Sequence, residues 1–250
     1  GDDSIEGGAG ADAIDGGAGT NTVSYAGSGA VTVDLTDSDN NAGADAEGDV
    51  LSNIANVIGS GNADTITGDA NANVIEGGAG DDTIDGGAGS GTFVYTGDGS
   101  DGEDTINNFT AGANGDVIDI TTSEVVDNGG NVDVDGFALL AGGAATVNDG
   151  LVVIDNNDGT NNDAGGLGTA AVQTYLGDVD GNGNAIVADD ADDHFYIVVS
   201  DGTDSALFEY IGSADTADTT IEDGELDLIA TFAGIGDAGT LTAANFDGFA

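Results

Sequence analysis

The sequence has no lysine, arginine, cysteine, methionine, tryptophan or proline among its 250 residues. Without cysteine it can form neither disulfide bonds nor thiolate metal sites. Without lysine and arginine its 48 acidic residues face a single histidine, and the formal net charge is −48. Nucleic acid and anionic membranes would add further negative charge, so both are poor candidates for neutralising it, and we expect no nucleic-acid partner. No apolar run approaches the roughly 20 residues that a membrane-spanning helix needs, so we expect no membrane insertion.

Repulsion between the carboxylates opposes any compact fold of this chain. Two unit charges about 4 Å apart repel by roughly 1 kcal/mol in water, and a domain's net stability is only about 5–15 kcal/mol. Metal cations or high salt would therefore have to neutralise a folded state. Composition alone also fits a disordered chain or the solvated surface of a halophilic protein. The spacing of the residues separates these alternatives.

Nine-residue units occur in two blocks. They start at Gly7 and Gly16, then at Gly59, Gly68, Gly77 and Gly86, and the opening GDDSIE fits the last six places of another unit. We therefore expect the chain to be a piece of a longer protein. Position one is glycine in all six units that show it. Position eight is always apolar, and position six is Asp or Asn in every unit except the last, where it is Gly91.

Each unit has a simple physical interpretation. Glycine at positions one, two and four allows positive φ and a tight turn, and the last three residues form a short strand with one side chain pointing inward. Two units then make one coil, so that units 18 residues apart stack at the strand spacing of about 4.8 Å. The stacked turns line a groove with carbonyl and carboxylate oxygens, which are the ligands that Ca²⁺ prefers.

The pattern resembles the RTX (hemolysin-type) calcium-binding repeat, GGxGxDxUx, over residues 1–24 and 59–94. The resemblance implies an all-β protein with a right-handed parallel β-roll, whose neighbouring turns share Ca²⁺. A solvated turn residue is the alternative for any single acid, and Gly91 suggests a capped end. The ligands implied are the carboxylates of Asp3, Asp12, Asp64 and Asp82, weaker amide ligands at Asn21 and Asn73, and backbone oxygens near Gly8, Gly10, Gly59, Gly61, Gly78 and Gly80.

We expect the roll to span residues 1–98, with a β insert at residues 25–58 that continues the sheet as an edge hairpin or loop. Residues 99–127 resemble the segment that closes the roll in secreted RTX proteases. Asp101 and Asp104 are candidates there for a terminal Ca²⁺ site, with solvated loop acids as the alternative. Ile106 and Phe109 are expected to pack on the open end of the roll.

Residues 128–250 lack the repeat and alternate short apolar segments with Gly, Asp and Asn turns, which predicts an antiparallel sheet or sandwich. Asp201-Gly202 fits a hairpin turn. Asp178, Asp180 and Asn182 stand at positions one, three and five of a segment like an EF-hand loop, but no flanking helices are evident, so an acidic turn is the alternative. About residues 191–250 resemble the uncleaved signal of type I secretion substrates.

We expect no enzyme activity in these residues. His194 is the only histidine, and neither HExxH nor G-x-S-x-G occurs. The first function hypothesis is a secreted bacterial protein that folds on Ca²⁺ and self-assembles into a surface layer, sheath or matrix fibre. The second is the calcium-binding module of a larger secreted enzyme, toxin or adhesin, and the third is a salt-tolerant halophilic protein. The partners expected are calcium ions, the type I secretion machinery and further copies of the chain.

Overall fold

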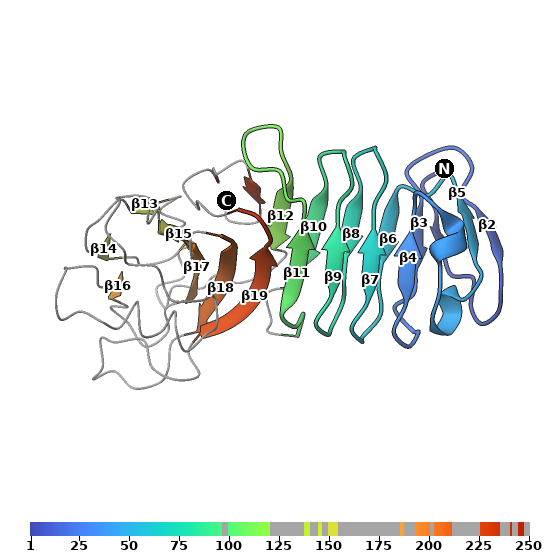
Figure 1. The fold of residues 1–250 in the computed structure, drawn as a ribbon, viewed down its shortest axis with the longest axis horizontal. Helices are drawn as coiled ribbons and strands as arrows, with labels where there is room; N and C mark the ends of the chain where they lie inside the picture. The colour runs from blue at the N-terminus through green and yellow to red at the C-terminus, as the bar shows by residue number, and fades with distance from the viewer. Residues whose placement is uncertain are drawn as a thin grey trace. The chain divides into compact units, whose positions relative to one another are not determined.

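The computed structural model of the chain is built from β-strands (Figure 1). In its described part, helical structure is limited to two 3₁₀ turns, η1 (Ser38–Asn40) and η2 (Ala44–Ala46), and nothing helical there could cross a bilayer. Two compact units emerge, Gly1–Thr121 with Ala244–Asp247, and Thr122–Ala243 with Gly248–Ala250. The structure describes residues 1–96, 100–120, 138–140, 145–146, 150–154, 186–187, 194–200, 203–211, 226–235, 241 and 245–247.

The first unit is a parallel β-roll, as the sequence predicts. The chain passes back and forth between two sheets, and neighbouring strands within each sheet are parallel. One sheet contains, in spatial order, β1 (Ser4–Ile5), β3 (Thr22–Ser24), β6 (Asn56–Ile58), β8 (Val74–Glu76), β10 (Thr92–Tyr95), β12 (Val117–Ile120) and β20 (Phe246–Asp247). The other contains β4 (Thr32–Asp34), β7 (Thr65–Thr67), β9 (Thr83–Asp85) and β11 (Asp104–Asn107), while β2 (Ala13–Asp15) pairs with β5 (Val50–Ser52).

The strand register confirms that two nonapeptides make one coil. Ile66 of β7 pairs with Ile84 of β9, and Ile75 of β8 pairs with Phe93 of β10, both at a separation of 18 residues. The pairing continues beyond the nonapeptides, because Ile106 of β11 follows Ile84 in the same row. The roll therefore contains more coils than the glycine-rich units alone would build.

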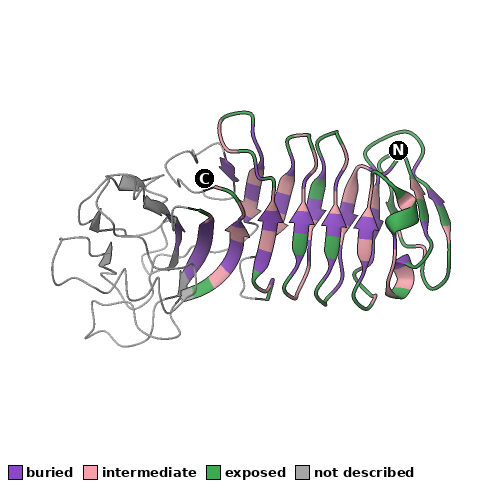
Figure 2. Cartoon of the chain, viewed as in Figure 1, coloured by how far each residue is buried: buried purple, intermediate pink, exposed green. Residues whose placement is uncertain are grey.

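The core of the roll is a ladder of single apolar side chains. Each of these short strands turns its second residue inward, so that Ile66, Ile75, Ile84 and Phe93 are all 1% exposed or less. Figure 2 shows this as a buried band across the middle of successive strands, flanked by more exposed residues. Phe109 lies beside Phe93 at a ring-centroid distance of 6.0 Å and is buried, so it extends the ladder past the last nonapeptide.

The segment between the two blocks contributes strands to both sheets of the roll. Val33 of β4 pairs with Ile66, and Val57 of β6 pairs with Val23 and Ile75. An antiparallel bridge between Thr32 and Ala42 turns the chain back on itself beside β4. The interruption of the glycine pattern therefore leaves the stacking of the strands intact.

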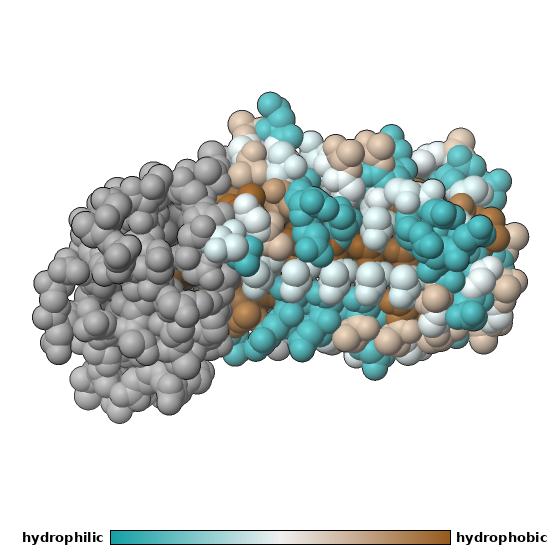
Figure 3. Space-filling view, in the orientation of Figure 1, coloured by the Kyte–Doolittle hydropathy of each residue, from teal (hydrophilic) through white to brown (hydrophobic). Residues whose placement is uncertain are grey.

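The outer face of the roll is largely polar. Side chains on either side of each buried residue point outward, and register aligns them in rows, such as Thr65, Thr83 and Thr105 on β7, β9 and β11. Figure 3 shows this face mainly in hydrophilic and neutral colours. Val50 and Val74 are the large apolar residues exposed in the described part of the chain.

The second unit contains the antiparallel sheet that the sequence predicts. Strand β17 (His194–Ser200) pairs antiparallel with β18 (Ser205–Ile211), which pairs antiparallel with β19 (Leu226–Phe232). Parallel pairs, which the sequence did not predict, join β13 (Ala138–Leu140) to β15 (Gly150–Ile154), β15 to β17, and β14 (Ala145–Thr146) to β16 (Ile186–Val187). Parallel pairing needs a return connection, and the residues between β15 and β17 are numerous enough to provide one.

Candidate metal centre

The glycines of the turns have two different roles. At positions two and four they adopt positive φ, as expected, for example +97° at Gly78 and +111° at Gly80; Gly89, at position four of the last unit, is the exception. Position-one glycines do not, and the prediction of positive φ there is wrong. A Cβ atom at Gly77 would instead overlap Oδ2 of Asp82, so this glycine is needed to make room for the position-six carboxylate. Because Gly77 has no side chain, its backbone can lie close to the carboxylate of Asp82.

The position-six acids of one sheet form a hydrogen-bonded series, which we call the position-six ladder (Asp64, Asp82 and Asp104). Oδ1 of Asp64 accepts the Val31 N–H at 2.7 Å. Oδ1 of Asp82 accepts the Asp64 N–H at 2.7 Å, and Oδ1 of Asp104 accepts the Asp82 N–H at 2.9 Å. All three acids are buried. Each carboxylate thus ties its own turn to the turn of the preceding coil.

Oxygen atoms crowd the space between these turns. A Cβ atom at Gly59 would meet the carbonyl oxygen of Gly77 and Oδ2 of Asp64, and one at Gly78 would overlap the carbonyl oxygen of Ser60. Asp64 also accepts hydrogen bonds from the N–H and the hydroxyl of Ser60. Backbone carbonyls and acids of neighbouring turns are therefore close together, as the proposed oxygen-only site requires.

Along the other edge of the roll, amides replace acids at position six. Oδ1 of Asn21 accepts the Asp3 N–H at 3.1 Å, and its Nδ2 donates to the Asn53 carbonyl at 3.0 Å. Nδ2 of Asn73 donates to the Ala55 carbonyl at 2.8 Å. Both amides are buried, whereas Asp3, just before β1, is exposed. An amide can donate as well as accept, so these turns are joined without a buried charge.

Two carboxylate oxygens of the roll are buried and have no hydrogen-bond donor among the described residues. They are Oδ2 of Asp12 and Oδ2 of Asp82. An unpaired buried anionic oxygen is costly, and this chain has no lysine or arginine to compensate for it. A divalent cation bound by oxygen ligands would remove this cost. The residues present therefore fit Ca²⁺.

Burial makes these acids hard to ionise without a cation. Burial, opposed by the Asp64 N–H and reinforced by the charge of Asp64, raises the pKa of Asp82 to about 7. Burial likewise raises the pKa of Asp104 to about 8, with the Asp82 N–H opposing the shift and the Asp82 charge adding to it. The pKa of Asp116 is also raised, mainly by burial. These are the shifts expected for carboxylates that lack a positive partner.

The two acids expected at the end of the roll have different partners. The Asp101 carboxylate accepts hydrogen bonds from the backbone N–H and the hydroxyl of Thr96, at 3.0–3.1 Å. Asp104 belongs to the position-six ladder instead and receives the Asp82 N–H. Asp101 and Asp104 influence each other through charge, since Asp101 contributes to the raised pKa of Asp104.

Other residues singled out from the sequence lie elsewhere. Asp178, Asp180 and Asn182 are outside the described residues, and His194 is the first residue of β17. Across the described ranges, no three of the Asp, Glu and His side chains converge as a metal-binding group. An ion in the roll would therefore draw most of its ligands from backbone carbonyls.

Two further acids occupy position six without a glycine-rich turn, and sequence reasoning missed them. Asp49 precedes β5 and receives the Asp12 N–H on Oδ1 at 2.8 Å. Asp116 precedes β12 and receives the N–H groups of Gly91 and Thr110 at 2.6 and 2.7 Å. The remaining signal is an acid two residues before the inward apolar position, as in Asp49-Val50-Leu51 and Asp116-Val117-Ile118.

Comparison with known families agrees with this geometry. The family model of the RTX calcium-binding nonapeptide repeat, in four copies, matches residues 1–24 and 58–93. These residues are RTX repeats. Because the RTX repeat family binds Ca²⁺, calcium is the ion to which these turns are suited. No curated protein matches the chain closely enough to count as a relative. The RTX match covers about a quarter of the chain, while the ladder of strands and acids extends beyond it to Asp104 and Asp116.

Proposed function

We propose that this chain is an extracellular structural protein of a bacterium that folds when it binds Ca²⁺ after secretion. The observation that carries the proposal is the buried Oδ2 of Asp82, which has no donor in the described chain and belongs to a carboxylate with a pKa of about 7. At neutral pH such a group favours either a proton or a cation, and the RTX repeats supply the carbonyl oxygens that suit Ca²⁺.

The chain's own residues would provide the switch between two states. At low free Ca²⁺, repulsion among the carboxylates opposes stacking of the turns, and the chain stays extended enough for export. Bound Ca²⁺ supplies the positive charge that the sequence lacks. Asp64 and Asp82 then hold their turns against the neighbouring coils through the N–H contacts of the position-six ladder. A site at 100 times its dissociation constant adds about 2.7 kcal/mol to the folded state.

A calcium titration followed by far-UV circular dichroism tests the proposal. The full chain in chelator should give a coil spectrum, and Ca²⁺ in the range of about 10⁻⁴–10⁻³ M should convert it steeply to a β spectrum. Equal ionic strength of NaCl is the control and should leave the coil spectrum unchanged. A β spectrum that is already complete in chelator would contradict the proposal, and complete folding by NaCl would favour the salt-tolerant alternative.

We further propose that the folded protein assembles with copies of itself rather than performing catalysis. The absence of lysine and arginine leaves no site for trypsin-like cleavage, which suits a durable extracellular material. We assign the type I export signal to about residues 191–250 and the closure of the roll to residues 99–127. Electron microscopy of the chain with and without Ca²⁺ tests assembly. Regular polymers only with Ca²⁺ support it, whereas dispersed monomers at all concentrations favour the module of a larger secreted protein.

A further inference from the structure

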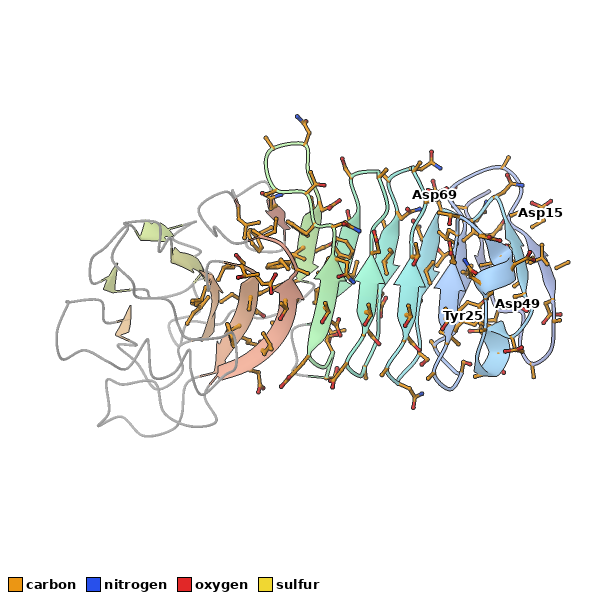
Figure 4. All side chains as sticks on the ribbon, in the orientation of Figure 1. Asp15, Tyr25, Asp49 and Asp69 are labelled. Atoms are coloured by element: carbon orange, nitrogen blue, oxygen red, sulfur yellow. The ribbon has the colours of Figure 1, made fainter. Side chains whose placement is uncertain are left out.

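The turns along the two edges of the roll differ in charge. The chain enters the sheet of β3, β8 and β10 through three glycine-rich turns that contain one acid between them, Asp69. It leaves this sheet, towards β2, β7 and β9, through three others that contain four acids, Asp12, Asp64, Asp81 and Asp82. In Figure 1 the turns before β8 and β10 lie along the upper edge of the roll and those before β7 and β9 along the lower edge, and Figure 4 shows Asp69 on the upper edge. We call the turns 16–21, 68–73 and 86–91 the neutral edge, and the turns 7–12, 59–64 and 77–82 the acidic edge.

Asn73 of the neutral edge faces one donor and one acceptor of the backbone. Its Oδ1 accepts the Asp69 N–H of its own turn at 2.8 Å, and its Nδ2 donates to the Ala55 carbonyl of the preceding coil at 2.8 Å. The side chain is buried, with 1% exposure. An N–H can pair only with the amide oxygen and a carbonyl only with the amide nitrogen, so the backbone fixes the orientation of this amide. An ionised carboxylate in its place would have no hydrogen for the Ala55 carbonyl.

The same pairing recurs at both ends of this row of turns. Asn21 accepts a backbone N–H on Oδ1, and its Nδ2 donates to the Asn53 carbonyl at 3.0 Å. Asn245, which precedes β20 in the same sheet, accepts the Gly112 N–H on Oδ1 at 2.9 Å and donates to the Asp116 carbonyl at 2.8 Å. Both amides are fully buried. Hydrogens on an amide nitrogen therefore join neighbouring turns at three places along this sheet.

The acidic edge has the opposite arrangement. Oδ1 of Asp82 accepts the Asp64 N–H at 2.7 Å, but Oδ2 of this residue, which is 2% exposed, has no donor among the described residues. A Cβ atom at Gly77 would overlap this Oδ2, and one at Gly59 would meet the Gly77 carbonyl oxygen and Oδ2 of Asp64. Oxygen atoms of neighbouring turns thus face one another with a buried anionic oxygen among them. Such an arrangement is stabilised by positive charge.

We propose that Ca²⁺ binds along the acidic edge only, and that the amide groups of Asn21, Asn73 and Asn245 take the place of the cation beside the other sheet. The calcium part rests on the proposed function, whereas the amide part rests on hydrogen bonds of the chain itself. Calcium affinity depends on the number of charged ligands, and the turns of the neutral edge offer a single acid. The amides of Asn21 and Asn73 are then donors between turns and not the weaker calcium ligands that the repeat pattern implies.

The dependence of stability on calcium counts the ions. The free energy of unfolding rises with the logarithm of the Ca²⁺ concentration, and near saturation the slope gives the number of ions released on unfolding. Denaturant unfolding of the full chain at several Ca²⁺ concentrations measures this slope. We expect Asn73→Ala to lower the free energy of unfolding by the same amount at every concentration and to leave the slope unchanged. Asp82→Asn should lower the slope by about one ion.

A matched charge control separates a lost ligand from a lost charge. Asp69→Asn removes the same charge as Asp82→Asn, but from the neutral edge, and should leave the slope unchanged. A lower slope in Asn73→Ala or in Asp69→Asn would overturn the proposal, and so would an unchanged slope in Asp82→Asn. If Asn73→Ala does not fold, Asn21→Ala in the first block takes its place, with the same expected result.

Crystals of the unmodified chain grown with Ca²⁺ locate the ions without any substitution. Anomalous scattering from calcium should give peaks at coordination distance, about 2.3–2.6 Å, from oxygens in the turns of Asp64 and Asp82. A peak at this distance from Oδ1 of Asn73 or of Asn21 would overturn the proposal and leave calcium-dependent folding intact. A slope of zero in the unmodified chain would instead contradict calcium-dependent folding, and the calcium part of this proposal would fail with it.

Discussion

The backbone N–H of Asp64 donates a 2.7 Å hydrogen bond to the carboxylate of Asp82, 18 residues later in the chain. This contact spans one complete coil and joins two equivalent turns. It makes the position-six acid a structural partner of the backbone as well as a candidate calcium ligand. Substitution of such an acid should therefore affect both the strength of calcium binding and the stacking of the coils.

Neutralising Asp82 should raise the calcium concentration needed for folding. Asp82→Asn keeps the shape of the side chain but removes the charged Oδ2 that lacks a donor in the described residues. Loss of one site held at 100 times its dissociation constant would cost about 2.7 kcal/mol of calcium-dependent stability. The midpoint of a calcium titration measures this. Asp81→Asn is the control, because it removes the same charge from an exposed neighbour; equal shifts in the two variants would contradict a specific role for Asp82.

Lowering the pH should partly replace calcium. The folded pKa values of Asp82 and Asp104 are about 7 and about 8, above the unfolded value near 3.8, so the folded state binds protons more tightly. Stability from these groups is then fully present below the unfolded pKa and is lost as the pH rises through 7–8. In chelator, β structure should increase between pH 8 and pH 5, as circular dichroism would show. In the Asp82→Asn/Asp104→Asn double variant this dependence should be much weaker, and an unchanged dependence would rule out these two acids as its source.

Substitution of Gly78 should be far more harmful than that of Gly61. Gly78 has a φ of +97°, and a Cβ atom there would overlap the carbonyl oxygen of Ser60. Gly78→Ala should lower the free energy of unfolding by about 1–3 kcal/mol through backbone strain alone. The overlap with the Ser60 carbonyl should add to this loss. At Gly61 a Cβ atom meets nothing within 4 Å, so Gly61→Ala should change stability by about 0.5 kcal/mol or less. Denaturant unfolding at saturating Ca²⁺ compares them, and similar losses would show that the packing of the turns has been misjudged.

Removing one step of the inner ladder should destabilise the whole roll. Ile84 is 1% exposed and lies between Ile66 and Ile106 in its row. Ile84→Ala should lower the free energy of unfolding by about 2–5 kcal/mol, because the thin core cannot close around the cavity. Equilibrium unfolding with Ca²⁺ present measures the loss. Val50→Ala, at a residue that is 56% exposed, should have little effect; a comparable loss there would argue against the single-residue core.

Asn245 should be important for the last rung of the roll. It is fully buried, its Nδ2 donates to the carbonyls of Asp116 and Gly112 at 2.8 and 3.2 Å, and its Oδ1 accepts the Gly112 N–H at 2.9 Å. Asn245→Ala should cost about 1–3 kcal/mol, because backbone groups lose their partners. Hydrogen exchange of the Gly112 amide should become faster. Asn114→Ala, at an exposed residue of the same loop, is the control, and unchanged exchange in the Asn245 variant would show that the contact is dispensable.

The sequence predicts the regular part of this fold because its determinants are local. Gly77 and Ile84 stand at fixed places within one nonapeptide, so the strand, the inward residue and the 18-residue coil can all be derived from spacing. The role of Gly77 could not, because the close approach of Asp82 to its backbone becomes visible only when the turn is folded. For the same reason the sequence does not reveal which acids keep an unpartnered oxygen.

The irregular coils could not be predicted because their partners are distant in the sequence. Asp49 joins the coil of Asp12 across 37 residues, and the turn before it has none of the glycines that mark a unit. Asn245 reaches Gly112 across 133 residues. Long-range contacts of this kind depend on where the intervening chain returns, and composition contains little information about that. Only the spacing of an acid two residues before an apolar residue survives as a local signal.

The separations between stacked strands are unequal: 34 residues from Thr22 to Asn56, 18 from Thr65 to Thr83, and 25 from Thr92 to Val117. Foreign peptides inserted after Tyr25 or Tyr95 would therefore extend outward from a loop between strands and leave the strand pairing of the two sheets intact. Deleting a single residue within a strand would instead reverse which side chains face inward. The roll should therefore tolerate inserted loops between its strands, whereas single-residue deletions within the strands should disrupt it.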